Sequence, residues 1–215
     1  MSPEQYIASI PATFRASDRD DRPASLSETQ RALATMIFRR FIEAGYPTRV
    51  AIAAVVNSYA ESRLRADLVA TEDDGRKSVG LFQLYDGGAG AGMSVAARQN
   101  PETNISRLLE AERRALGDHV TDGTTTPAEA TWAFCYYVER PSNKSVKSDI
   151  RARLCAAMFP RYYNAGPDQL PQAVPDVPAE QKHLKGSLTT SGDTPVRVTS
   201  GGAWWLPVLA LFLLV

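Results

Sequence analysis

Glu61 is the residue of this sequence best placed for acid–base chemistry. It follows an apolar run, residues 50–60, whose composition predicts a helix buried on most faces. A carboxyl group at the end of such a helix lies at the negative end of the helix dipole and is partly removed from water. Both effects favour the protonated carboxyl, which is the form that a general acid needs. The structural alternative is a solvated Glu on the last helical turn.

The chain after Glu61 passes through a polar loop and then becomes apolar again. Residues 63–77 are rich in charged residues, and residues 80–84 read Gly-Leu-Phe-Gln-Leu. The segment is expected to form one wall of a cleft next to Glu61.

Several helices are expected to position this stretch. Residues 25–44 open with Ser-Leu-Ser-Glu, which is typical of a capping box, carry an aliphatic and aromatic stripe, and end before Gly45. Thr48 is the expected N-cap of the helix that leads to Glu61. Further helices are predicted over residues 102–116, from the Thr-Pro-Ala-Glu capping box at 126–129 onward, and over residues 145–159, with a loop at 117–125.

Four motifs, in this order, resemble those of the lysozyme-like peptidoglycan lysins, a group that includes lytic transglycosylases, goose-type lysozymes and phage tail lysozymes. They are Ala-Gly-Tyr-Pro at residues 44–47, Glu61-Ser62 together with the Gly-Leu-Phe-Gln-Leu segment, the helix-opening residues 100–105, which include Asn104, and residues 132–141, which end in Glu-Arg-Pro. The resemblance runs from about residue 25 to residue 159. It implies an α+β fold that is mainly α, with a small β element between Asp67 and Leu84.

The resemblance also implies roles for individual residues. Glu61 would be the acid that cleaves the β-1,4 bond between N-acetylmuramic acid and N-acetylglucosamine in peptidoglycan glycan strands. The expected substrate-binding residues are Ser62, Gln83, Asn104, Tyr137 and Glu139. Glu139 could equally be a structural partner of Arg140 or Arg151.

The resemblance leaves open whether the reaction is hydrolysis or transglycosylation. A hydrolase would use a second carboxylate to hold water, and the candidates are Asp67, Asp73, Asp74 and Asp86. A lytic transglycosylase needs none, because one Glu protonates the glycosidic oxygen and then takes a proton from the muramyl 6-hydroxyl. The Tyr-Asn-Ala-Gly sequence at residues 163–166 echoes a transglycosylase motif but lies far downstream of the motif's usual place.

Composition excludes several other classes of protein. The formal net charge is zero, so nothing favours nucleic acid as a partner. Cys135 and Cys155 are too few for a disulfide scaffold and are expected to be buried free thiols. The two histidines have no Cys/His cluster around them, and the glycine-rich residues 86–93 lack the ending of a P-loop. The sequence therefore predicts no metal site and no cofactor.

The two ends of the chain differ from the expected catalytic domain, residues 25–163. Residues 1–24 are mixed in polarity, do not resemble a signal peptide and are expected to be an N-terminal arm. Residues 164–199 have the composition of a linker, and residues 200–215 are strongly apolar with Trp204 and Trp205 near their start. These last residues are expected to anchor the chain in a membrane, although their length is marginal for a span. A truncated anchor and a tail that docks on a partner are the alternatives.

Together these features favour a virion-associated phage lysin. It would be anchored in an internal virion membrane, act on the bacterial cell wall during entry and contact other virion proteins. Two alternatives stay open. One is a non-catalytic lysozyme-like virion or membrane protein that binds glycan or serves assembly, and the other is a bacterial enzyme that remodels the wall.

Overall fold

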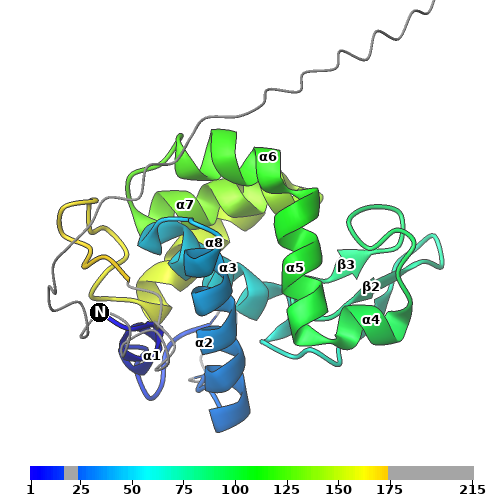
Figure 1. Ribbon diagram of the computed structural model, residues 1–215, viewed down its shortest axis with the longest axis horizontal. Coiled ribbons are helices and arrows are strands. Elements are labelled where there is room, and N and C mark those ends of the chain that lie inside the picture. The colour runs from blue at the N-terminus through cyan, green and yellow to red at the C-terminus, as the bar shows by residue number, and fades with distance from the viewer. Residues whose placement is uncertain (17–23, 174–215) are drawn as a thin grey trace, which may run out of the picture. The chain divides into compact units, whose positions relative to one another are not determined.

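Helix α3, Thr48–Ser62, is the centre of the fold in the computed structural model, which describes residues 1–16 and 24–173. Every side chain from Val50 to Tyr59 is buried. Ala and Val dominate this helix, and their small side chains let helices α2, α7 and α8 pack against it on several sides. Figure 1 shows α3 behind α2, with the small sheet set apart beyond helix α5. The prediction of a buried helix that carries Glu61 on its last turn is confirmed.

Several helices begin with side-chain caps. Such caps begin α1, Pro3–Ala8, α2, Glu28–Glu43, and α7, Pro127–Ala133, whereas α8, Lys144–Met158, has no side-chain cap. The capping box of α2 is formed by Ser27 and Gln30, two residues later than predicted, and that of α7 is formed by Thr126 and Glu129 as predicted. Helix α3 itself has no side-chain cap, because its N-cap is Pro47 and not Thr48. Thr48 is buried instead, and its hydroxyl accepts a hydrogen bond from the Ala173 amide at 3.1 Å.

Part of the expected N-terminal arm packs on the core. Helix α1 buries Tyr6 and Ile7, and the Tyr6 ring stacks on Phe38 with 5.0 Å between ring centroids. The Tyr6 hydroxyl donates to the carbonyl of Pro171 at the other end of the described chain. The described residues therefore all fall in one compact unit.

The small β element lies where it was expected. Strands β1, Val69–Thr71, β2, Lys77–Val79, and β3, Leu84–Tyr85, form an antiparallel sheet in that order. Val79 lies opposite Val69 on one side and Leu84 on the other. This sheet confirms the α+β, mainly α, lysozyme-like fold.

A buried arginine ties the sheet to helix α4, Val95–Gln99. The Arg98 side chain is 2% exposed, and one of its terminal nitrogens donates to the carbonyls of Leu84 at 2.8 Å and Lys77 at 3.0 Å. Its other terminal nitrogen forms an ion pair with Asp86. The charge is thus compensated inside the protein, as a buried guanidinium requires.

The helical path on the far side of the cleft differs from the predicted one. After α5, Pro101–Ala111, and α6, Arg113–Ala115, the chain continues as a π-helix, η1, Leu116–Thr121, where a loop was predicted. A second π-helix, η2, Phe134–Glu139, follows α7 without a break. Because π-turns close on the fifth residue, they place side chains differently from an α-helix of the same sequence.

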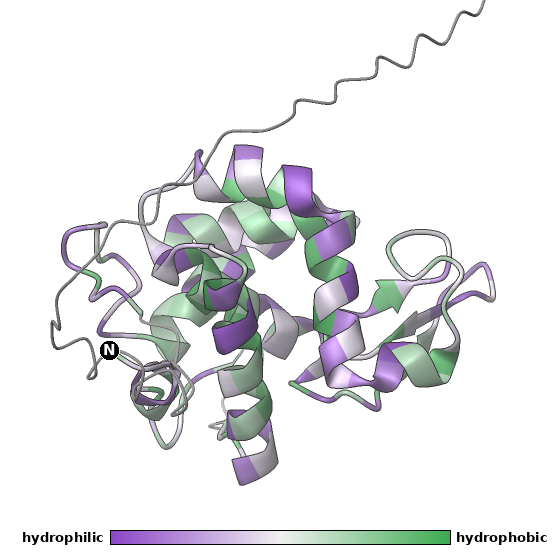
Figure 2. Ribbon diagram, in the orientation of Figure 1, coloured by the Kyte–Doolittle hydropathy of each residue, from purple (hydrophilic) through white to green (hydrophobic). Residues whose placement is uncertain are grey.

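The hydropathy of the helices follows their packing, as Figure 2 shows by the green stretches that face the interior. The apolar residues of α8 are only partly buried: Leu154 and Met158 lie in the core, whereas Val146 is 59% exposed and Ile150 42% exposed. Both cysteines are buried and unpaired, as expected.

No helix within residues 1–16 and 24–173 has both the length and the apolarity to cross a membrane. The expected anchor, residues 200–215, lies outside the described residues, as does most of the expected linker. The linker's first residues, 164–173, are described, and Leu170 among them is buried.

Candidate active site

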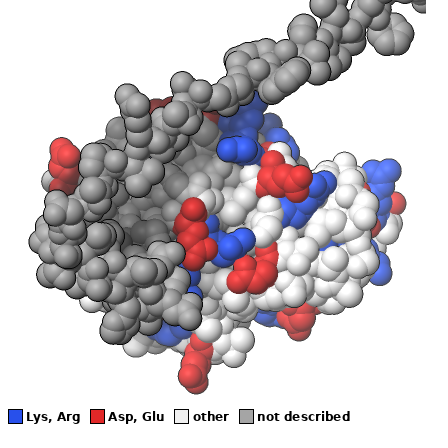
Figure 3. Space-filling model, viewed as in Figure 1, with Lys and Arg blue, Asp and Glu red and all other residues white. Residues whose placement is uncertain are grey.

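A cleft of about 720 Å³ lies between the end of α3, the sheet, and η2. Glu61 lines it from α3, and Glu139 lines it from η2. The remaining lining side chains come from the sheet and its loops, from α5 and α8, and from the turn after η2: Ala70, Glu72, Asp73, Asp74, Ser78, Phe82, Gln83, Leu84, Tyr85, Ala89, Leu108, Glu112, Val138, Arg140, Pro141, Ser142 and Lys147. Acidic and basic side chains are interspersed on the described surface in Figure 3, in line with the zero net charge.

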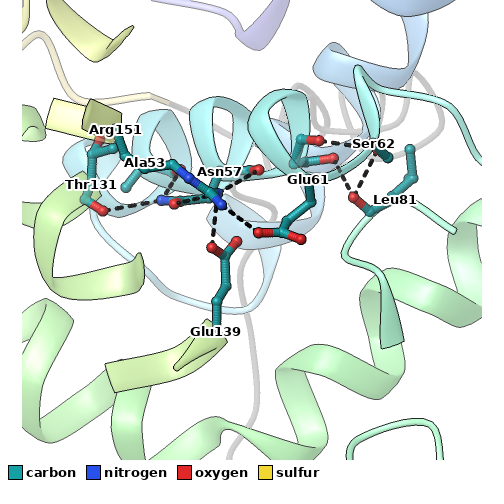
Figure 4. Close-up of polar contacts among 9 residues, drawn as sticks. Ala53, Asn57, Glu61, Ser62, Leu81, Thr131, Glu139 and Arg151 are labelled. Atoms are coloured by element: carbon teal, nitrogen blue, oxygen red, sulfur yellow. Dashed lines mark hydrogen bonds and ion pairs between the residues drawn. The ribbon is translucent and has the colours of Figure 1, made fainter. Parts of the chain in front are cut away.

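Glu61 reaches the cleft with a side chain that is 23% exposed. One of its carboxylate oxygens forms an ion pair with Nη2 of Arg151, which lies on α8. Figure 4 shows the guanidinium of Arg151 between the carboxylates of Glu61 and Glu139. The ion pair fixes the position of the Glu61 carboxylate at the edge of the cleft.

Hydrogen bonds to Asn57 fix the position of the Arg151 side chain. Its Nη1 donates to the side-chain oxygen and to the backbone carbonyl of Asn57, both at 3.2 Å. The Asn57 amide nitrogen in turn lies 2.9 Å from the carbonyl of Ala53 and 3.2 Å from that of Thr131. Asn57 is fully buried on the same face of α3 as Glu61, four residues before it. The sequence reasoning did not find Asn57 as a site residue.

Glu139 is the structural partner of Arg151, one of the two arginines considered from the sequence, and its substrate-binding role stays a prediction. It lines the cleft, and its carboxylate lies 2.8 Å from Nη1 of Arg151. Arg140, the other partner considered, pairs with Glu112 at 2.6 Å instead. The Glu139 side chain is only 6% exposed. Burial raises the pKa of Glu139 well above its usual value; Arg151 opposes this shift and the nearby charge of Glu61 adds to it.

Ser62 supports the cleft wall and does not reach the cleft. Its hydroxyl is buried 2.9 Å from the carbonyl of Leu81, and the hydroxyl of Ser58 lies 3.1 Å from the same oxygen. Two hydroxyls from successive turns of α3 thus fix the backbone of the wall segment. Figure 4 shows Ser62 and Leu81 by the C-terminal end of α3, with Glu61 between them and Arg151.

Asn104 and Gln83 hold the same wall from its other end. Asn104, fully buried, accepts from the amide of Phe82 at 3.1 Å and donates to the carbonyls of Val79 at 3.1 Å and Arg98 at 2.8 Å. The side-chain amide of Asn104 is therefore occupied by hydrogen bonds to the backbone of this chain. Gln83 lines the cleft with a φ of +45°, and its amide nitrogen donates to the carbonyl of Gly80 at 2.8 Å.

Gly80 is the tightest point of this wall, and replacing it with Ala is expected to destabilise the protein by about 2–4 kcal/mol. Its φ is +84°, and a Cβ there would lie 2.3 Å from the carbonyl oxygen of Arg98 and 2.4 Å from the Asn104 amide nitrogen. Gly75→Ala is the matched control, because Gly75 has a φ of +80° and no atom within 4 Å of an added Cβ. It should cost only about 1 kcal/mol. Equal losses for the two variants in urea unfolding would contradict the close packing around Gly80.

One protein family matches this chain. The sequence model of the phage tail lysozyme family matches residues 32–162, which is more than half of the chain and includes all the residues of the Glu61 network. The chain belongs to the phage tail lysozyme family. Its function is accordingly lysozyme-like and peptidoglycan-lytic. No curated protein and no solved structure matches the chain.

One residue expected to bind substrate lies apart from the Glu61 cleft of this phage tail lysozyme. Tyr137 lines a different cavity, of about 460 Å³, together with Trp132 and His119. Its ring stacks on His119 with 4.2 Å between centroids. Because Tyr137 and Glu139 are two positions apart on a helix, they point to opposite sides of it.

The structure also separates the four candidates for a second carboxylate. Asp67 pairs with Arg65 at 3.4 Å and Asp86 with Arg98, and neither lines the cleft. Asp73 and Asp74 both line it. Asp74 accepts from the Tyr85 hydroxyl, and this hydrogen bond lowers the pKa of Asp74. Asp73 and Asp74 are therefore the candidates that remain near the cleft.

Proposed function

We propose that this chain cleaves the bond between N-acetylmuramic acid and N-acetylglucosamine in peptidoglycan, with Glu61 as the general acid. The observation that carries the proposal is the position of Glu61: a partly exposed carboxyl at the end of a buried helix, in a cleft, oriented by a buried arginine. A general acid needs this combination of access to substrate and fixed geometry.

In the reaction, Glu61 donates its proton to the glycosidic oxygen as the bond to C1 of the muramyl ring breaks. The leaving sugar departs with a neutral 4-hydroxyl group, and Glu61 becomes a carboxylate. Arg151 compensates that new negative charge at the moment it forms. The positive charge that develops on the muramyl ring is then quenched either by water or by the ring's own 6-hydroxyl.

Product masses test the proposal and distinguish these two endings. Purified peptidoglycan is digested with the full chain, and the soluble muropeptides are analysed by mass spectrometry. We expect muropeptides that end in muramic acid: 1,6-anhydro forms, lighter by one water, if the 6-hydroxyl attacks, and reducing forms if water attacks. Glycan binding without any product, from a folded sample, would favour the non-catalytic alternative and contradict the proposal.

We also propose that the protein is carried in a phage virion and opens the cell wall during entry, with residues 200–215 as its membrane anchor. The family description supports the first part, and the apolar composition of these residues supports the second. Detection of the chain by mass spectrometry in purified virions, and its release by detergent but not by high salt, would agree with both parts. Release by salt alone would contradict the anchor.

A further inference from the structure

The network around Arg151 contains one cation and two carboxyl groups. The Arg151 side chain is 9% exposed and contacts Glu61 through Nη2 and Glu139 through Nη1. Asn57 also accepts hydrogen bonds from the guanidinium. Arg151 is therefore held in one position and cannot move toward one carboxylate and away from the other. Both carboxyl groups therefore pair with the same fixed cation, the guanidinium of Arg151.

The charges of this network do not balance if both carboxyl groups are ionised. Two carboxylates and one guanidinium leave one net negative charge in a region largely removed from water, and such a charge is costly. One proton, on either carboxyl group, brings the network to neutrality. Oε1 of Glu139 is also buried without a hydrogen-bond partner of normal geometry among the described residues, which is a poor environment for a full carboxylate.

The other ionisable groups nearby do not supply the missing positive charge. The Cys135 thiol lies one turn before Glu139 on η2, and burial raises its pKa to about 11, so it is neutral at ordinary pH. Glu112 and Arg140 compensate each other. Lys147 lines the cleft from α8 and forms no ion pair with either carboxylate of the network. A proton bound to one of the two carboxyl groups is therefore the simplest way to make the network electrically neutral.

We propose that Glu61 and Glu139 share one proton across Arg151, and that Glu139 is the positioning residue that keeps Glu61 available as an acid. This inference rests on the proposed role of Glu61. In one arrangement the proton is on Glu139 and Arg151 pairs with Glu61. In the other the proton is on Glu61 and Arg151 pairs with Glu139. Only the second arrangement can protonate a glycosidic oxygen, and the proton lost to the leaving sugar is regained from the attacking water or 6-hydroxyl.

The proposal predicts how Glu139→Gln changes the dependence of rate on pH. The variant removes one negative charge, so Arg151 then stabilises the carboxylate of Glu61 alone, and Glu61 keeps its proton only at lower pH. We expect the alkaline limb of kcat/KM to move down by about one pH unit or more, which lowers the rate at pH 7 roughly tenfold. At pH 5 the variant should act within a few-fold of the wild type. Glu139→Asp keeps the negative charge, so its alkaline limb of kcat/KM should lie closer to that of the wild type than the limb of Glu139→Gln does.

A purely structural role for Glu139 would give a different result. The rate of Glu139→Gln would then fall by the same factor at every pH, and that outcome would overturn the proposal. Circular dichroism across the same pH range confirms that each variant is folded. Glu43→Gln, an exposed carboxyl paired with Arg40 outside the cleft, is the control for the substitution itself.

A titration that does not depend on activity separates this inference from the proposed function. The ¹³C chemical shifts of the Glu61 and Glu139 carboxyl carbons are followed by NMR against pH in the wild type and in Glu139→Gln. Shared protonation predicts that both wild-type carbons shift in two common steps, and that Glu61 shifts in one step, at lower pH, in the variant. Independent single steps in the wild type would refute sharing even if the enzyme is lytic. Common steps in a protein without lytic activity would uphold sharing and refute only the proposed function.

Discussion

Glu61→Gln is expected to lower the rate of peptidoglycan cleavage by about 10²- to 10⁴-fold, the range that general acid catalysis contributes. The Gln amide cannot donate a proton of comparable acidity to the glycosidic oxygen. Its carbonyl oxygen can still accept from Nη2 of Arg151, so the fold and the arginine should stay in place. The rate is measured as release of soluble muropeptides under substrate-limited conditions, which reports kcat/KM.

Two observations make the Glu61→Gln result specific. Glu43→Gln changes the same chemical group on an exposed part of α2 and should retain the wild-type rate. Binding of Glu61→Gln to insoluble peptidoglycan, measured by sedimentation, should also be close to that of the wild type. A variant that still cleaves at more than a tenth of the wild-type rate would rule out Glu61 as the acid.

Arg151→Met is expected to destabilise the fold by about 3–5 kcal/mol at pH 7, because removing one partner of a buried ion pair leaves the others uncompensated. Arg151 contacts Glu61, Glu139 and Asn57, and Met has no group that can replace any of these hydrogen bonds. The measurement is urea unfolding followed by circular dichroism, with the change read as a shift of the midpoint at constant slope.

The loss in Arg151→Met should depend on pH and on Glu139. Burial raises the pKa of Glu139 in the folded protein, so the native state binds more protons than the unfolded chain above the ordinary pKa of a glutamate. Stability is therefore greatest below that ordinary pKa and falls as the pH rises through the folded value. The double variant Arg151→Met/Glu139→Gln should recover part of the loss at pH 7, and no recovery would mean that the uncompensated carboxylate is not its cause.

The sequence was sufficient for the parts of this protein that depend on local pattern. The apolar run before Glu61 predicted the central helix, and the resemblance predicted the sheet. The network around Glu61 depends instead on a contact between residues 90 positions apart. Arg151 was named from the sequence only as one of two possible partners of Glu139, and its contacts with Glu61 and Asn57 depend on how α8 packs against α3.

Other differences have identifiable physical causes. The first helix was overlooked because it is one of the shortest in the fold, although Ser2 and Gln5 form a capping box with Pro3 at the first helical position. Tyr137 was assigned to the same cleft as Glu139, yet two positions along any helix separate side chains onto different faces. That spacing alone could have placed Tyr137 elsewhere.

Helix η2 has a consequence for how this sequence is aligned with others. A π-turn is equivalent to one extra residue accommodated within an α-helix, and here it comes just before Glu139 at the edge of the cleft. A relative whose helix is regular at this point would have one residue fewer here. If the two sequences are aligned without a gap at that place, the residue whose carboxylate faces the cleft falls in a neighbouring alignment column. Removing one residue from within η2 of this chain should therefore give a regular α-helix and keep Glu139 facing the cleft and Arg151.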